Sequence, residues 1–426
     1  MEWDRTRIRA LRVALRLPQD KFANQLGAAP KTICNWEQGK HPPGLALMRA
    51  LDEMWESTSP EQKKRFFLSL SAMPPDELAE EGRATAVDRA HVPVSAGPFA
   101  SSGTGCEPVQ LEPIRDALSY YPRFDAAPAL ILRLDEAQQL TDEVHRRYQA
   151  ADYARAASLL PGLIRGMDGL VVEGGGSIER AALVAQSSVY EVTAKLVTKV
   201  GDPQLAWLAA DRAINAAQRA EDPLRFAAAA YQVVCAFLER GQLAEAERIA
   251  VTTADTLVDS TPLGLSLRGA LTLIASIIAG RRNDRVEALE RLDRARQLST
   301  TLGHDGNHGW TAFGPTNVQI HSVSVAVELG DVDDGIARAE DVHIGHLPAG
   351  LLSRRAQVHI DCAWAYAQRH QDAASVGNLL EAEAVAPQTL RYNLVVRALL
   401  PQMLERERRS ATPGLRALAQ RAGVLQ

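Results

Sequence analysis

The chain is predicted to be all-α, with a small helical domain at the N-terminus and a long array of helical hairpins after it. Two patterns predict this class. A pair of short helices is indicated between Leu17 and Pro43, and alanine-rich helical segments separated by small turns recur further along the chain. A third observation agrees with them: aromatic residues are only 5% of the 426 residues, which favours closely packed helices over a sheet sandwich.

The stretch from Leu17 to Pro43 has the pattern of a helix-turn-helix. Pro18 suits the first position of a helix, and apolar residues then recur at i, i+1 and i+4 from Phe22. Gly27 ends this helix. A second helix, predicted over Pro30 to Gln38, again opens on a proline and is stopped by the Gly-Lys-His-Pro-Pro that follows.

The polar face of the second helix carries the predicted DNA contact. Lys31, Thr32 and Asn35 lie on this face near the N-terminal half, which in a helix-turn-helix is the part that meets base edges in the major groove. The alternative is that the two helices are only a packing unit and these side chains only a solvated face. The glycines, the prolines and the Trp-Glu pair, all at fitting offsets, favour DNA binding.

This pattern resembles the phage repressor and Cro class, the XRE family. The resemblance implies that the first helix of the domain spans roughly Thr6 to Leu15 and is tied to the end of the recognition helix by an ion pair between Arg12 and Glu37. It also implies that Gln19 contacts a DNA phosphate and that Pro30, Lys31 and Asn35 contact bases. Gln38 and Lys40 fall at positions where the family contacts the DNA backbone. DNA would be read as a duplex, by heads acting in pairs.

The sequence departs from the family pattern at two positions. Ala29 stands where the family has a Ser or Thr before the recognition helix, so one N-cap hydrogen bond is lost at a cost of about 1 kcal/mol. Pro30 occupies a position that often carries a base-reading amide. Readout is therefore expected to depend on fewer side chains.

Charge is distributed unevenly along the chain. Residues 1–70 hold 12 Lys and Arg against 8 Asp and Glu, whereas the other 356 residues hold 35 against 44. The overall net charge of −5 is therefore the sum of a basic N-terminal region and an acidic region that follows it. Only the N-terminal region is expected to seek phosphate, because affinity for the nucleic-acid backbone needs clustered positive charge.

Composition also bounds the location and chemistry of the protein. No run of 18 or more apolar residues and no signal-peptide pattern is present, so we expect a cytoplasmic protein without a membrane span. The four cysteines show no metal-ligand spacing, and we expect no metal and no cofactor. Cys34, in the predicted recognition helix, is either an ordinary residue or a redox sensor.

Three domains are expected. Residues 1–70 form the DNA-binding domain, residues 71–106 form a flexible linker rich in Pro, Gly, Ser and Ala, and residues 107–426 form the repeat domain. In the repeat domain, turns 40 to 50 residues apart are predicted at Ala151, Gly201, Gly241, Arg282, Gly330 and His370. Such periods are typical of stacked helical hairpins.

The repeat domain resembles tetratricopeptide repeats. More narrowly, residues 201–224, 310–331 and 379–393 are similar to those of actinobacterial regulators that join an XRE head to a tetratricopeptide body. The resemblance covers roughly residues 5–70 and 107–405. It implies an all-α solenoid, and it is weak for function because repeat solenoids serve many partners. Because the heads of the family act in pairs, we expect this body to hold them together as a homodimer.

One segment of the repeat domain departs from repeat chemistry. His304 to His321 interrupts the helices with glycines, aromatics and polar side chains, the mixture that lines small-molecule pockets. The candidate effector pocket consists of Asn307, His308, Trp310, Phe313, Asn317 and His321. The alternative is a long connection whose aromatic residues cap the core.

No catalytic constellation is visible, so we do not expect an enzyme. Two hypotheses remain. The first is a sequence-specific transcription regulator whose body dimerises and binds a small-molecule or peptide effector. The second is a protein-interaction scaffold that uses the solenoid groove and has a weak or non-reading helix-turn-helix.

Overall fold

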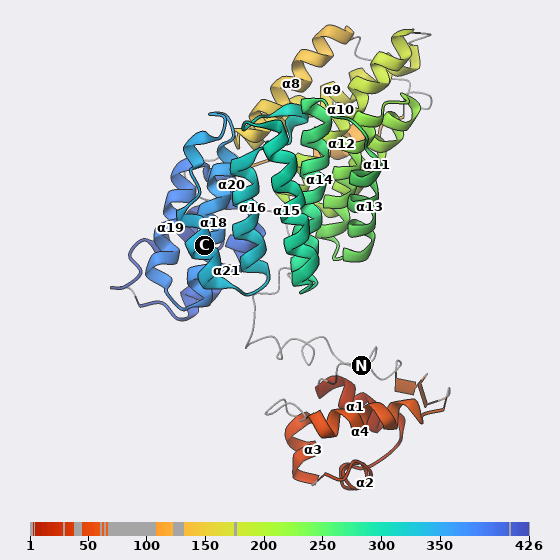
Figure 1. Ribbon diagram of the computed structural model, residues 1–426, viewed down its shortest axis with the longest axis vertical. Coiled ribbons are helices and arrows are strands. Elements are labelled where there is room, and N and C mark those ends of the chain that lie inside the picture. The colour runs from red at the N-terminus through yellow and green to blue at the C-terminus, as the bar shows by residue number, and fades with distance from the viewer. Residues whose placement is uncertain are drawn as a thin grey trace. The chain divides into compact units, whose positions relative to one another are not determined.

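The protein is described here by a computed structural model. It describes residues 3, 5–28, 30–37, 45–59, 62–63, 65–66, 108–121, 132–173, 177–408 and 410–425. Every regular element within these ranges is a helix, which confirms the predicted all-α class (Figure 1). The chain divides into two compact units, Met1–Ala86 and Val87–Gln426, called the head and the body below. The linker predicted at 71–106 lies outside the described residues.

The head contains the helices α1 (Arg5–Ala14), α2 (Gln19–Gln25), α3 (Pro30–Glu37) and α4 (Leu45–Glu56). Helix α3 packs against both α1 and α2. The head has its own small core, because every helix contributes apolar side chains that are almost fully buried: Ile8 and Leu11 from α1, Phe22 from α2, Ile33 and Trp36 from α3, and Leu51 from α4.

The predicted helix boundaries in the head agree with the structure to within two residues. Helix α1 begins and ends one residue before the predicted range, and α3 begins at Pro30 as predicted. Helix α2 gives way to a turn at Gly27, whose φ of +67° lies in the left-handed region that glycine adopts without strain. This turn sets the direction in which α3 leaves α2.

In the described part of the body, the first helix is α7 (Glu112–Leu118), and consecutive helices pack against each other. Most are long, and their bounds are α8 (Leu134–Gln149), α9 (Tyr153–Glu173), α10 (Ser177–Val200), α11 (Pro203–Arg219), α12 (Pro223–Glu239), α13 (Leu243–Thr256), α14 (Pro262–Arg281), α15 (Arg285–Leu302), α16 (Pro315–Glu328), α17 (Val332–Glu340), α18 (Leu352–Gln368), α19 (Asp372–Val385), α20 (Pro387–Tyr392), α21 (Leu394–Glu405) and α22 (Leu415–Arg421).

Each of the six turns predicted in the body joins two of these helices, from α8 and α9 at Ala151 to α18 and α19 at His370. The backbone is left-handed at every turn, and only the turn predicted at Arg282 has its left-handed residue one position later, at Asn283. Two outer helices, α11 and α15, then start on an aspartate cap; Asp202 Oδ1, for example, accepts the backbone N–H of Leu205 at 3.0 Å.

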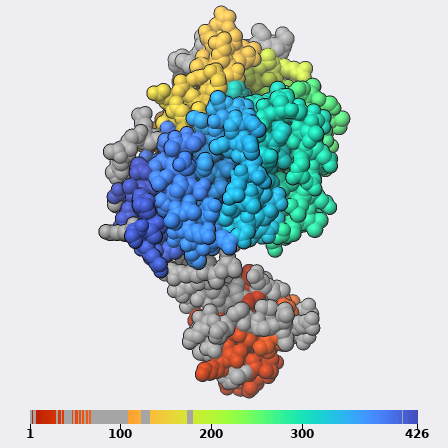
Figure 2. Space-filling model, turned by 60° about the vertical axis from the view of Figure 1, so that its left-hand side comes forward, coloured from red at the N-terminus to blue at the C-terminus, as the bar shows by residue number. Residues whose placement is uncertain are grey.

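The helices of the body form an inner and an outer layer. The even-numbered helices from α8 to α18 contact each other in sequence, while the odd-numbered helices from α9 to α19 pack outside them. The inner layer closes on itself, because α18 also contacts α8. Figure 2 shows this meeting of distant segments, with the yellow start of the body lying against the blue helices near its end.

Helix α14 is long and apolar enough to cross a membrane by length and composition alone. In the body, 83% of its most apolar 18-residue stretch is buried, and the helix packs against α12, α13, α15 and α16. Burial on all sides requires apolar residues around the whole circumference of a helix. The central position of α14 in the body therefore accounts for its composition.

Candidate functional site

The surface of α3 is the first candidate site. Ile33 and Trp36 turn into the core of the head, while Lys31 is exposed and Thr32 is half-buried. The helix therefore presents polar residues outward from its first turn. Two further predicted DNA-contacting residues, Gln38 and Lys40, lie outside the described residues, as do the side chains of Pro30 and Asn35.

A charged contact ties α3 to the rest of the head. Arg12 Nε lies 2.5 Å from Glu37 Oε1, and its Nη2 donates to Oε2 at 3.0 Å, which makes a bidentate pair. Gln19 Nε2 also donates to Glu37 Oε2, at 2.6 Å. The structure thus brings together Arg12 and Glu37, as the resemblance implied, and adds Gln19, which was assigned to phosphate. One carboxylate therefore links α1, α2 and the last residue of α3.

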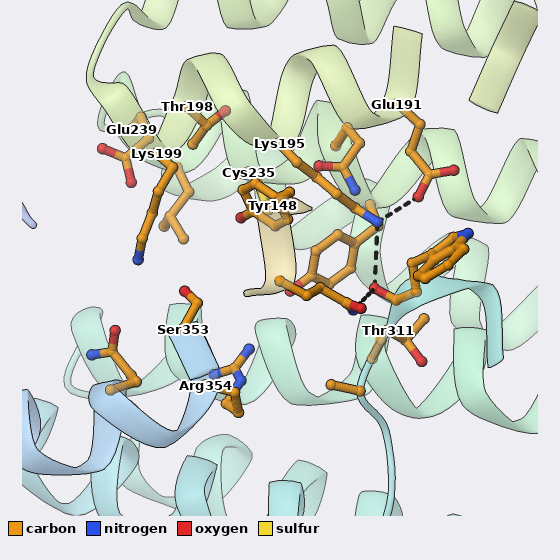
Figure 3. A pocket seen from close by; sticks show the side chains of 18 of the residues that line it. Tyr148, Glu191, Lys195, Thr198, Lys199, Cys235, Glu239, Thr311, Ser353 and Arg354 are labelled. Carbon is orange, nitrogen blue, oxygen red and sulfur yellow. Dashed lines mark hydrogen bonds and ion pairs between the residues drawn. The ribbon is translucent and has the colours of Figure 1, made fainter. Parts of the chain in front are cut away.

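A cavity of about 360 Å³ inside the body is the second candidate site. Its walls are formed by five inner helices, by the start of α21 and by the segment between α15 and α16. The residues that line it include Tyr148, Lys195, Lys199, Tyr231, Cys235, Glu239, Trp310, Ser353, Arg354 and Asn393. Its size and its mixture of apolar and convergent polar groups are typical of small-molecule sites. Figure 3 shows the labelled side chains gathered around the hollow.

Most of the charged side chains on the α10 wall are paired. Lys195 Nζ lies 2.6 Å from Glu191 Oε1, and Arg225 Nη1 lies 3.7 Å from Oε2 of the same carboxylate. The Glu191 side chain is only 2% exposed, so it depends on these two cations. The same lysine also donates to the backbone oxygen of Trp310 at 3.4 Å. This wall is therefore already organised without a ligand.

The connection between α15 and α16 supplies another wall and crosses to α8. The indole of Trp310 stacks on the buried imidazole of His145 with a centroid distance of 4.8 Å and an interplanar angle of 3°. Gln149 and Asn307 exchange two amide hydrogen bonds, of 2.8 and 2.9 Å. Burial, reinforced by the nearby Lys195, holds the pKa of His145 well below its usual value. The stack is therefore between neutral rings.

The backbone of this connection is strained next to the cavity. Trp310 and Ala312 have φ values of +58° and +56°, a region that non-glycine residues rarely occupy. Each costs about 1 kcal/mol or more and persists only where the surroundings impose it. Here the Asn307 amide imposes it in part, because its Oδ1 accepts the N–H of Ala312 at 3.2 Å.

The structure distributes the six residues of the predicted effector pocket unevenly. Trp310 lines the cavity. Asn307 does not line it but forms hydrogen bonds with Gln149, which does. His308 lies beside His304 instead, with 3.4 Å between their Nε2 atoms. The other three are buried in the wall around α14 and α16 and do not line the cavity: Phe313, Asn317 and His321.

His321 is buried and neutral. Burial is the main cause that lowers its pKa to about 3, and the nearby Arg354 lowers it further. Its Nδ1 donates to the backbone oxygen of Asn317 at 2.9 Å. The Oδ1 atom of Asn317 is buried without a hydrogen-bond partner. This part of the segment is therefore core, as in the alternative interpretation of the sequence.

Sequence reasoning missed most of the lining. Lys195, Tyr231 and Arg354 come from three helices more than 30 residues apart and each sits inside an ordinary amphipathic pattern. Only the closure of the inner layer brings them together. The one sequence signal was the irregular composition of His304 to His321, which located the connection but not the helices facing it.

Metal ligands do not gather in the described part of the chain, where no group of three or more His, Cys, Asp or Glu side chains is found. Cys235 lies on the cavity wall, and burial raises the pKa of its thiol to about 12, so it is a poor nucleophile. Cys34 belongs to α3, but its side chain lies outside the described residues. The cavity is therefore suited to binding and not to thiol chemistry.

Comparison with known proteins adds no relative: no protein family matches the chain, and no curated protein has significant sequence similarity to it.

Proposed function

We propose that the protein is a cytoplasmic, sequence-specific DNA-binding transcription regulator of the XRE type with a tetratricopeptide-like body. The observation that carries the proposal is the arrangement of α2 and α3. Helix α3 buries Ile33 and Trp36 and directs Lys31 outward from its first turn, and Glu37 fixes its far end to Arg12. A helix held rigidly with a polar outer face and a basic surrounding is suited to the major groove.

The proposed DNA contacts follow from this arrangement and from the sequence. Lys31, Thr32 and Asn35 read base edges, and Lys40 and Gln38 contact the backbone. Gln19 is engaged by Glu37, so any phosphate contact it makes uses the remaining hydrogen of its amide or follows release of that bond. The net charge of +4 in residues 1–70 supplies the long-range attraction.

The body is proposed to dimerise and to sense an effector. One recognition helix meets one half-site, and two half-sites one turn of DNA apart, about 34 Å, need two heads. The cavity is proposed as the effector site, because it has the size of a ligand pocket and a wall with strained backbone at Trp310 and Ala312. A ligand that binds better to one conformation of this wall shifts the population between conformations.

A gel shift with the intact protein tests the proposal. The DNA is the region flanking the protein's own coding sequence, and the competitor is unrelated DNA of the same length. We expect a specific complex with two chains for each duplex, counted by mass photometry. The affinity falls steeply as salt rises, and Lys40→Ala reduces the slope of log affinity against log salt by about one unit.

A complex that competitor DNA removes as easily as the specific duplex contradicts sequence-specific binding. A chain that binds no DNA at any salt concentration favours the scaffold hypothesis instead. A single chain on a duplex contradicts dimerisation alone and leaves DNA recognition by the head intact.

A further inference from the structure

The cavity of the body contains an unpaired positive charge. Arg354, in the first turn of α18, is partly buried and lines the cavity. Within the part of the chain that the structure describes, its guanidinium has no hydrogen bond and no ion pair. Figure 3 shows it extending into the hollow from the α18 side, facing Lys199 on α10. An arginine that is kept partly out of water and has no partner is available to a ligand.

The other charged groups of the lining do not neutralise Arg354. The lining contains four cationic side chains, Lys195, Lys199, Arg281 and Arg354, but only two acidic ones, Glu191 and Glu239. Glu191 is held by Lys195 and Arg225, while Arg281 is paired with Glu328 outside the lining, at 3.2 Å. The lining therefore carries an excess of two positive charges.

The surroundings of Arg354 also indicate where its charge acts. Burial raises the pKa of the Tyr148 and Tyr231 hydroxyl groups, and the positive charge of Arg354 lowers it. Both tyrosines line the cavity. Arg354 also lowers the pKa of His321 behind the wall. These groups lie on α8, α12 and α16, so Arg354 is close enough to three other helices to act on their side chains.

Apolar side chains also line the cavity. Among them are Leu238 from α12, Leu267 and Ala270 from α14, and Leu351 before α18. They are almost fully buried. A ligand that fills about 360 Å³ here meets a cationic end and an apolar surface at once.

We propose that the cavity binds a small amphipathic organic anion, whose carboxylate or phosphate group is held by Arg354 and whose apolar part lies against α12 and α14. This inference deepens the proposed effector function and rests on it for its biological meaning, but the binding itself does not depend on DNA. The guanidinium offers two parallel N–H donors that match a carboxylate or phosphate. Ser353 and Lys199 add polar contacts at the same end.

Binding of two related fluorescent probes to the intact protein tests the proposal. One probe is 1-anilinonaphthalene-8-sulfonate, an amphipathic anion, and the other is N-phenyl-1-naphthylamine, its neutral counterpart without the sulfonate. Titrations are made without DNA on the wild type, Arg354→Gln, Arg354→Lys and Arg248→Gln. Arg248 is an exposed arginine on α13 that does not line the cavity and serves as the matched control.

We expect the wild type and Arg248→Gln to bind the anion equally, at one site for each chain. Arg354→Gln should weaken anion binding tenfold or more, Arg354→Lys should weaken it less, and the neutral probe should bind all four proteins within twofold. Wild-type protein that does not bind the anion, Arg354→Gln that binds it as the wild type does, or equal weakening of both probes would overturn the proposal.

Competition on the wild type keeps the proposal testable even if Arg354→Gln does not fold, as judged by circular dichroism. Benzoate should displace the anionic probe at a concentration at least tenfold below that of benzyl alcohol, which is similar in size but neutral. Equal displacement by the two competitors would contradict an anion site. Because no DNA is present, Lys31→Ala should behave as the wild type here, which separates a failure of this proposal from a failure of DNA binding.

Discussion

The carboxylate of Glu37 joins three helices of the head. It accepts hydrogen bonds from Arg12 and Gln19, and the side-chain exposures of Glu37 and Arg12 are only 8% and 17%. A buried charge pair contributes little net stability, but removal of one partner leaves the other charge without compensation. We therefore interpret this contact as one that sets the orientation of α3 relative to α1 and α2.

Single and double substitutions test this interpretation. Glu37→Leu should destabilise the head by about 3 kcal/mol, because it strands the Arg12 guanidinium, whereas the double variant with Arg12→Met should recover most of that loss. Hydrogen exchange of peptides from residues 5–37 in the intact chain measures it, with peptides from α10 as an internal control. Equal exchange in the Glu37→Leu variant and the double variant would show that the two side chains are not coupled.

We expect His321 to make the stability of the body depend on pH. Its pKa is about 3 in the folded body, against 6.5 in an unfolded chain, so the unfolded chain binds a proton that the folded one does not between these values. The stability that neutral His321 contributes is therefore fully present above pH 6.5 and is lost as the pH falls from 6.5 towards 3. Urea unfolding should show the stability gap between the wild type and His321→Gln narrowing by about 2 kcal/mol from pH 7 to pH 5. A stability difference between the two proteins that does not change with pH would show that His321 is not the group that titrates.

At the level of elements, the connection between α15 and α16 is the most informative part of the body. Phe313 anchors it by packing directly on α14, where a Cβ atom at Gly269 would lie 2.1 Å from the phenyl ring. The close approach requires glycine at that position of the helix. On the cavity side, Trp310 is fixed by the stack on His145. One short connection thus joins the core to the cavity wall.

Two glycine substitutions in helices test this packing. Gly269→Ala should lower the free energy of unfolding of the body by about 1–3 kcal/mol, because the phenyl ring must move. Gly377→Ala in α19 is the matched control, since nothing lies within 4 Å of its added Cβ, and it should raise stability by up to about 1 kcal/mol. If both variants shift the urea midpoint alike, Phe313 is not held as described.

Elements were more predictable from the sequence than the sites. The all-α class, the short helices of the head and the six turns of the body follow from proline, glycine and apolar spacing, all of which act within one or two turns of helix. The cavity depends instead on contacts between α8 and α18, more than 200 residues apart. Local periodicity contains no signal for such a closure, so Arg354 and Lys195 could not be singled out.

At the scale of the whole molecule, the chain combines two compact units that differ in content. The head contains a small core and the residues 1–70, whose net charge is +4, and the body contains the cavity and most of the acidic residues. Under the proposed function, an anion in the body changes how two heads are held, and the heads alone contact DNA. Substitutions in the cavity are therefore expected to leave DNA binding without the anion intact, and substitutions on α3 are expected to leave anion binding intact.

The central claim is that α3 reads DNA sequence, and selection from random duplex DNA tests it most directly. The intact protein should enrich a site with two half-sites about 34 Å apart. Fluorescence anisotropy should then show that Asn35→Ala and Lys31→Ala each weaken this site by about 1–3 kcal/mol while binding to unrelated DNA is unchanged. Failure to enrich any sequence, or variants that retain the full preference, would contradict the claim.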